Sequence, residues 1–194
     1  MQVEVRPKAL GFIPQVPEVQ GWYRGKRVRF YTYTTGSGKS RTHWAAVSAT
    51  PPEPSPLTLR ISRQGVGSKV RALFGAKEIE LGDAAFDRRW FIETDAPDFL
   101  RAAILPEVRT RLDRIAQRSR AGTYETVAGA VRYAEVGGFD SIERGERYIE
   151  ALEAVCDLAD VAEVYRGALE VTVLTPAAAL MRPHGEAAAR SRSV

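Results

Sequence analysis

The chain has little of what catalytic and membrane proteins usually show in their sequences. It has one cysteine, so neither an internal disulfide nor a cysteine-based zinc site can form. Its two histidines, His43 and His184, form no legible Cys/His or Ser/His pairing. No apolar run approaches the roughly 18 residues that a transmembrane helix needs, and prolines interrupt the N-terminal stretch, which does not resemble a secretory signal. We therefore expect a cytoplasmic protein with no catalytic, cofactor or metal site.

Enough apolar residues are present to form a core. The chain has 194 residues, of which 44% are hydrophobic and 9% aromatic, and this size suits one domain. We expect an extended N-terminal segment over residues 1–20, a single domain over 21–175 and a disordered tail over 176–194.

The charge is distributed unevenly. Residues 1–75 carry 12 Lys/Arg and 3 Asp/Glu, whereas the remainder carries 16 Lys/Arg and 21 Asp/Glu. A basic first half favours an anionic partner, which leaves nucleic acid, anionic lipid and an acidic protein open, and the asymmetry equally allows head-to-tail self-association.

Alternation with a period of two predicts strands in the first part of the chain. Residues 25–34 and 41–50 form two such runs around the turn 35–39, which indicates an antiparallel hairpin. Residues 51–56 hold four prolines and predict a loop. Leu57, Leu59 and Ile61 then alternate as a third strand.

The stretch 77–112 combines strand and helix signals. Ile79 and Leu81 predict a strand that ends at a turn beginning with Gly82. Phe86, Trp90 and Ile92 have the even spacing of a second strand. Asp95 is then a predicted N-cap ahead of Pro97, and Pro106 begins a second short helix.

The last third predicts a strand pair and a long helix. Residues 124–128 and 131–136 turn near Gly129. Asp140 with Glu143 resembles a capping box, from which a helix runs to about Arg166, and 169–174 are a candidate last strand. The predicted buried stripe of the helix consists of Ile142, Ile149, Leu152, Val155, Cys156, Ala159 and Ala162.

These elements predict an α+β fold. We expect a mainly antiparallel sheet of six or seven strands, two short helices, and a long C-terminal amphipathic helix packed on the sheet.

The middle stretch resembles an uncharacterised bacterial family of domains of unknown function. The resemblance covers residues 21–165 and rests on Gly82, Asp83, Phe86, Asp87, Arg88, Arg89, Phe91 and Leu105. Members of that family are often predicted beside transmembrane helices, and the resemblance implies no catalytic residues.

One face of the first strand is a candidate surface for an anionic partner. It carries Arg27, Arg29, Tyr31 and Tyr33, and arginines interleaved with aromatics occur where proteins bind nucleic acid or anionic lipid. The same pattern also occurs where long side chains simply cover a sheet. A related hypothesis is that the helix starting at Pro106 binds DNA as a recognition helix, with Arg111, Arg114 and Arg118 as its contacts. A solvated helix face explains these three residues better.

The C-terminal helix offers a second candidate surface. Glu146, Glu150, Glu153 and Asp157 form an acidic row, which is either a solvated face or a docking surface for a basic partner.

Other motifs favour structural interpretations. Residues 36–40, Gly-Ser-Gly-Lys-Ser, lack the earlier glycine of a phosphate loop and precede a strand, so they predict a hairpin turn. Asp83 and Asp87 suit a turn better than acid–base or metal chemistry. Cys156 on an apolar helix stripe is expected to be inert.

We expect a non-enzymatic binding or protein-interaction domain with a basic first half and an acidic last helix. A protein partner or self-association is favoured, with nucleic acid and peripheral membrane contact as alternatives. An enzyme whose site forms only in three dimensions is a further alternative.

Overall fold

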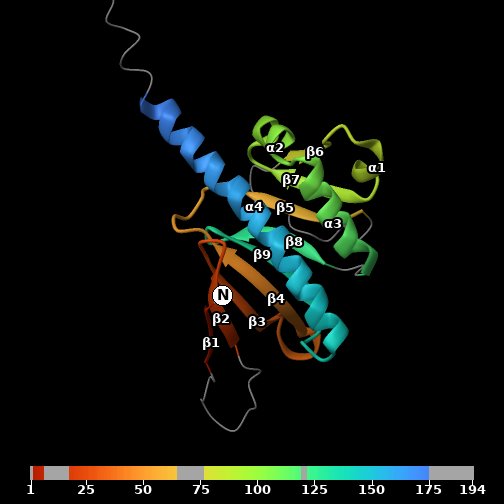
Figure 1. Cartoon of the computed structure of the whole chain (residues 1–194). Coiled ribbons are helices and arrows are strands. Elements are labelled where there is room, and N and C mark those ends of the chain that lie inside the picture. Colours follow the sequence, from red (N-terminus) through yellow and green to blue (C-terminus); the bar gives the residue numbers. More distant parts are fainter. Residues whose placement is uncertain (1, 7–17, 65–76, 119–121, 175–194) are drawn as a thin grey trace, which may run out of the picture.

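A computed structural model of the chain describes residues 2–6, 18–64, 77–118 and 122–174, with the backbone alone for 2–6 and 171–174 (Figure 1). The predicted tail 176–194 lies outside the described residues. Within them, the architecture is one open antiparallel sheet with helices on one of its faces, which confirms the predicted α+β class.

The sheet has nine strands in the described residues, in the order β1-β2-β3-β4-β9-β8-β5-β7-β6, and all neighbours are antiparallel. Their bounds are β1 Gln2–Arg6, β2 Glu18–Tyr23, β3 Lys26–Thr35, β4 Thr42–Thr50, β5 Leu59–Arg63, β6 Lys77–Ile79, β7 Trp90–Thr94, β8 Thr123–Val127 and β9 Ala130–Val136. The two extra strands relative to the prediction are β1 and β2, which lie largely within the segment 1–20.

The predicted hairpin forms two adjacent interior strands of the sheet. β3 and β4 pair over nine residues, from Arg27 opposite Thr50 to Thr35 opposite Thr42. Gly36 has a φ of +79°, a conformation that L residues rarely adopt, and the turn ends in a short 3-10 helix over Gly38–Ser40. Residues 36–40 therefore form a hairpin turn and lead into a strand.

Four α-helices lie on one face of the sheet: α1 Ala84–Asp87, α2 Pro97–Ala103, α3 Pro106–Arg118 and α4 Ile142–Leu174. α4 packs on β4 and β9, and α3 lies beside it. The buried Tyr148 hydroxyl donates to the Ala45 carbonyl at 2.7 Å and so ties α4 to β4. With 33 residues, α4 is about 50 Å long and extends past the sheet.

The predicted apolar stripe of α4 is correct in its middle and wrong at its start. Leu152, Val155, Cys156, Ala159 and Ala162 are buried as expected. Ile142 is 85% exposed and Ile149 is 63% exposed. Large apolar residues of α4 also lie on its exposed sides, including Val164 and Leu169, so hydrophobicity alone did not show which residues face the sheet.

Two element assignments differ from the prediction. Residues 169–174 continue α4 and do not form a strand, because β-branched residues can extend a helix once its first turns have formed. Phe86 lies in α1, since Asp83 caps that helical turn by accepting from the backbone N–H groups of Ala85 and Phe86.

Two predicted helix caps have other roles. Asp95 accepts from the Thr58 backbone N–H at 2.9 Å and does not cap α2. At the start of α4 the Ser141 hydroxyl accepts from the Arg144 N–H at 3.2 Å, whereas Asp140 forms an ion pair with the Arg144 side chain.

Candidate functional site

The sheet face opposite α4, which we call the outer face, carries the first predicted surface. Val28 and Val47 are buried on the helix-covered side. Because side chains alternate along a strand, Arg27, Arg29, Tyr31 and Tyr33 of β3 lie on the other side. The structure therefore places all four predicted residues on one face.

β4 adds a third ring beside the two tyrosines. Trp44 is opposite Tyr33 in the register, and their ring centres are 6.1 Å apart with planes 9° from parallel. The Tyr31 and Tyr33 ring centres are 6.0 Å apart. We call Tyr31, Tyr33 and Trp44 the aromatic row; all three side chains are partly exposed.

Two guanidinium groups lie over this row. Arg29 is 5.0 Å from the centre of the Tyr31 ring, and Arg132 of β9 is 4.6 Å from the centre of the Tyr33 ring. Such contacts hold the rings and the cations in fixed positions. Burial raises the pKa of Tyr33 and the nearby Arg132 charge opposes that rise, so the phenol is uncharged at neutral pH.

Both arginines are also paired with carboxylates. Arg29 Nε donates to Glu18 at 2.6 Å, and Arg132 pairs with Glu125 on β8. Arg27 is exposed and has no carboxylate partner among the described residues. The outer face is thus less basic than the sequence of β3 indicates.

The paired charges belong to a longer polar row across the sheet. From β2 to β6, cross-strand partners on the outer face bring together Gln20, Arg29, Ser48, Arg132, Glu125, Arg60, Glu93 and Glu78. Arginine and glutamate alternate over β9, β8, β5 and β7, and opposite charges on neighbouring strands stabilise a sheet.

The acidic row of α4, the second predicted surface, is paired within the chain. Arg118 of α3 contacts Glu150 at 2.6 Å and Glu146 at 3.7 Å. Glu153 and Asp157 each contact Arg111 of α3 and Arg24 of the β2–β3 turn, at 2.7–3.4 Å. Two of the three arginines in the recognition-helix hypothesis thus contact α4.

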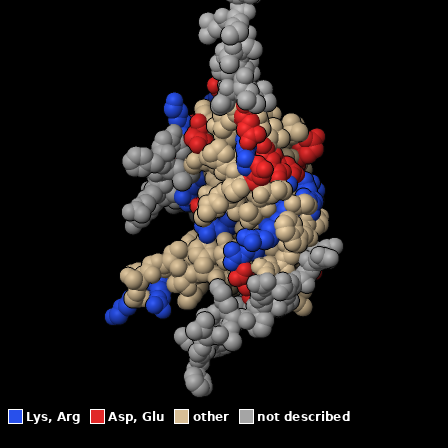
Figure 2. Space-filling view, turned by 90° about the vertical axis from the view of Figure 1, so that its left-hand side faces the viewer, with Lys and Arg blue, Asp and Glu red and all other residues tan. Residues whose placement is uncertain are grey.

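This ion-pair network continues toward the end of α4. The Lys26 ammonium is 3% exposed and donates to Asp160 and Glu163. Burial alone would lower the pKa of Lys26, but its hydrogen bonds to the two carboxylates outweigh that effect and raise it. Figure 2 shows acidic side chains gathered directly beside basic ones on this side of the molecule.

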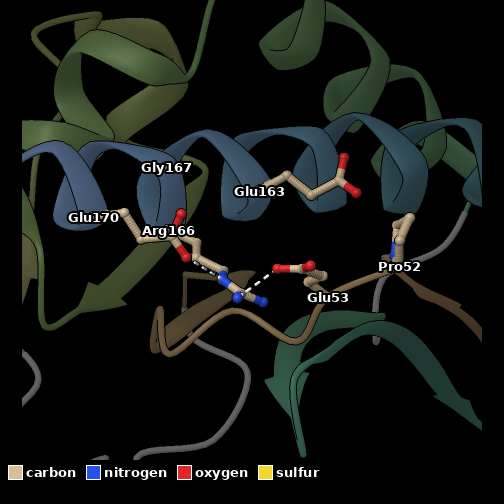
Figure 3. A pocket seen from close by; sticks show the side chains of 6 residues that line it. All are labelled: Pro52, Glu53, Glu163, Arg166, Gly167 and Glu170. Carbon is tan, nitrogen blue, oxygen red and sulfur yellow. Dashed lines mark hydrogen bonds and ion pairs between the residues drawn. The ribbon is translucent and has the colours of Figure 1, made fainter.

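A shallow cavity of about 240 Å³ lies beside the last part of α4. Its lining consists of Pro52, Glu53, Glu163, Arg166, Gly167 and Glu170 (Figure 3). Arg166 lies between Glu53 and Glu170 and pairs with both, and Glu163 is engaged by Lys26. The charged groups here are thus paired within the chain, with one carboxylate in excess over the two cations.

A second cavity, of about 270 Å³, has arginine in its lining. Arg63, Arg89, Asp113, Ala116 and Gln117 surround it. Arg63 donates to the Ala116 carbonyl at 2.5 Å, and Arg89 and the Trp90 indole both donate to Asp113. These bonds fix the end of α3 against β5 and β7.

The remaining motifs lie apart from one another. Asp83 caps α1, Asp87 accepts from the Leu81 N–H at 2.9 Å, and Cys156 is a buried residue of α4. Over the described ranges, no group of three or more His, Cys, Asp or Glu side chains is arranged to hold a metal ion. None of the helices described is both long and apolar enough to cross a membrane.

Sequence reasoning missed Trp44 and Arg132 as members of the outer-face site. Trp44 could have been found, because a hairpin turn centred on residues 38–39 brings it opposite Tyr33. Arg132 could not, because it reaches the site only through the pairing of β9 with β4, strands that are far apart in the sequence.

Comparison with known proteins shows a relation in fold. No protein-family model and no curated protein matches the chain. The chain is similar to the crystal structure of the mycobacterial trehalose monomycolate transport factor A, TtfA, with a TM-score of 0.55 and 12% sequence identity over 82% of this chain and 86% of that one. The absence of a family match is consistent with the resemblance to an uncharacterised family, whose identity stays a prediction.

Proposed function

We propose that this protein is a non-enzymatic interaction domain that binds a partner protein through the outer face around the aromatic row. The observation that carries the proposal is the placement of all four described α-helices on the opposite face. This arrangement leaves Tyr31, Tyr33 and Trp44 partly exposed on two interior strands of the sheet.

The side-chain chemistry of the outer face supports a protein partner. Tyr, Trp and Arg are the residues most enriched at the energetic centres of protein interfaces. Nucleic-acid affinity, by contrast, comes largely from cations that neutralise phosphates. Here Arg29 and Arg132 already pair with Glu18 and Glu125, so little free charge remains.

The second candidate is binding of nucleic acid or anionic lipid on the same face. Arg27 favours it, because this exposed cation has no carboxylate partner among the described residues. The acidic row of α4 remains a candidate docking surface for a basic partner, chiefly through Glu146, whose side chain is 63% exposed.

The fold neighbour is described as a transport factor, and a role exerted by binding is in keeping with that description. The proposal retains the expectations of a bacterial, cytoplasmic protein without enzymatic activity, and it includes self-association as one form of protein partnership.

Site-specific photo-cross-linking tests the proposal. A photoreactive phenylalanine analogue replaces Tyr33 in one variant and the exposed Ile149 on the helix side in a matched control, and both are irradiated in native cells. We expect a discrete protein adduct, or a cross-linked dimer, from position 33 and none from position 149. Adducts to nucleic acid or lipid at position 33, or equal yields from both positions, would contradict it.

A further inference from the structure

The chemistry of the outer face also indicates what kind of protein segment it accommodates. Resting on the proposed function, we propose that the aromatic row binds a proline-rich extended segment that carries an acidic residue on one side of its prolines. The prolines pack against the partly exposed side chains of Tyr31, Tyr33 and Trp44, beside the guanidinium groups of Arg29 and Arg132, and the acidic residue reaches Arg27.

The position of the row excludes recognition by strand addition. β3 is paired with β2 and β4, and β4 is paired with β3 and β9, so both strands have neighbours on both sides. Strand addition needs an open edge with free backbone N–H and C=O groups. A partner over Tyr33 and Trp44 must therefore be held by side chains.

Two polar groups beside the row are already engaged. The Trp44 indole N–H donates to the Thr35 hydroxyl at 2.8 Å. Arg132 pairs with Glu125 and lies over the Tyr33 ring. A ligand rich in hydroxyl or phosphate groups would have to break these bonds, whereas a proline ring needs only an apolar aromatic surface.

Proline-rich segments suit such a surface for two further reasons. The polyproline II helix is stiff before binding, so little conformational entropy is lost when it docks on aromatic rings. It rises about 3.1 Å per residue, so two residues span about 6 Å. This matches the 6.0 Å between the Tyr31 and Tyr33 ring centres along β3.

The charge of Arg27 determines on which side of the docked prolines an acidic residue is favoured. Arg27 lies on the same face four residues before Tyr31, which corresponds to about 13 Å along a strand. A polyproline II helix covers this distance in about four residues. Because Arg27 is exposed and lacks a carboxylate partner in the described ranges, an acidic residue about four positions from the docked prolines complements it.

The indole N–H signals provide a direct readout. The chain has three tryptophans, so a ¹⁵N spectrum shows three indole signals. We expect a blocked oligoproline peptide with a glutamate pair at one end to shift the Trp44 signal saturably, while the signal of the buried Trp90 stays in place. Two peptides, with the glutamate pair at the N-terminal or the C-terminal end, test both directions in which the segment can lie on the sheet. An oligoproline that carries lysines in place of the glutamates should bind more weakly.

Variants locate the binding on the row. Tyr33→Ala should weaken binding about tenfold, and Tyr31→Ala provides a second test if that variant folds poorly. Arg27→Ala should abolish the preference for the glutamate tag while oligoproline binding persists. Ile149→Ala on the helix side should bind like the parent protein.

Other outcomes decide against the inference. An unmoved Trp44 signal at millimolar peptide would overturn it, as would a Trp44 shift that oligothymidine, anionic vesicles or a maltooligosaccharide produces and oligoproline does not. If position 33 cross-links to a protein but oligoproline fails to bind, only the proline-rich ligand is wrong. If no cross-link forms either, the proposed function fails with it.

Discussion

Tyr148 illustrates how single polar residues hold the buried side of the sheet. Its hydroxyl is fully buried and donates to Ala45. Removing one partner of a buried hydrogen bond leaves the other unsatisfied, which costs about 1 kcal/mol. Tyr148→Phe should therefore lower the free energy of unfolding by about that amount in urea titrations. Tyr165→Phe is the control, because that partly exposed ring packs on Phe99 and its hydroxyl has no hydrogen bond described.

Cys156 is expected to be unreactive in the native protein. Burial raises the pKa of its thiol to about 11, so almost no thiolate is present at pH 8. A thiol reagent such as DTNB should label the protein at pH 8 only after guanidinium chloride unfolds it. Rapid labelling of the native protein would contradict the buried position.

Gly36 is the residue on which the tight hairpin turn depends. A Cβ atom there would lie 2.3 Å from the Ser40 carbonyl oxygen, and the φ of +79° is itself unfavourable for an L residue. Gly36→Ala should cost about 2 kcal/mol of stability. Gly25→Ala shares the positive φ but has open space, so it should cost clearly less in parallel thermal melts. Equal costs would show that the Ser40 contact is relieved elsewhere.

At the scale of elements, the ion pairs between α3 and α4 connect the two helices, so these charged residues do not merely form a solvated surface. Arg111 Nε lies 2.9 Å from Asp157, whose side chain is only 13% exposed. A double-mutant cycle with Arg111→Ala and Asp157→Ala should give a coupling of about 0.5–1 kcal/mol that decreases with salt. The exposed pair Arg101 and Asp98 at the same distance is the control and should couple by no more than about 0.3 kcal/mol.

The elements themselves were predictable to different degrees. The β3–β4 hairpin and the β8–β9 pair follow from local alternation and turn residues, and both were predicted nearly to their ends. Phe86 and residues 169–174 were misassigned, because short apolar runs fit a strand and a helix equally well. In both cases a contact elsewhere decided the outcome: the Asp83 cap for α1, and the long preceding helix for the end of α4.

At the scale of the molecule, the uneven charge is largely an internal complementarity. The basic β2–β3 turn, with Arg24 and Lys26, lies against Asp157, Asp160 and Glu163 of α4. The basic first half and the acidic last helix each suggested an external partner, but their charges partly neutralise each other within the molecule. The outer face, with its aromatic row, becomes the better candidate for partner binding.

The expectation of a single domain over residues 21–175 predicts one unfolding transition. β4 and β9 join the two parts of the sheet, and α4 packs on both strands. Variants that keep Trp44 or Trp90 as the single tryptophan report on the two parts separately. Their fluorescence midpoints in urea should coincide with each other and with the loss of far-UV circular dichroism. Two separate midpoints would show two units.

Strand alternation, the turn glycines and the amphipathic stripes determined the α+β class and most of the strands, because these signals depend on residues within a few positions of one another. The placement of Arg132 beside Tyr33, and the pairing of α4 carboxylates with Arg24 and Arg111, were decided only by tertiary structure. These partners lie far apart in the sequence, and the order of the strands and the packing of the helices bring them together. A charge's availability to a ligand depends on those distant neighbours, and no local pattern in the chain records them.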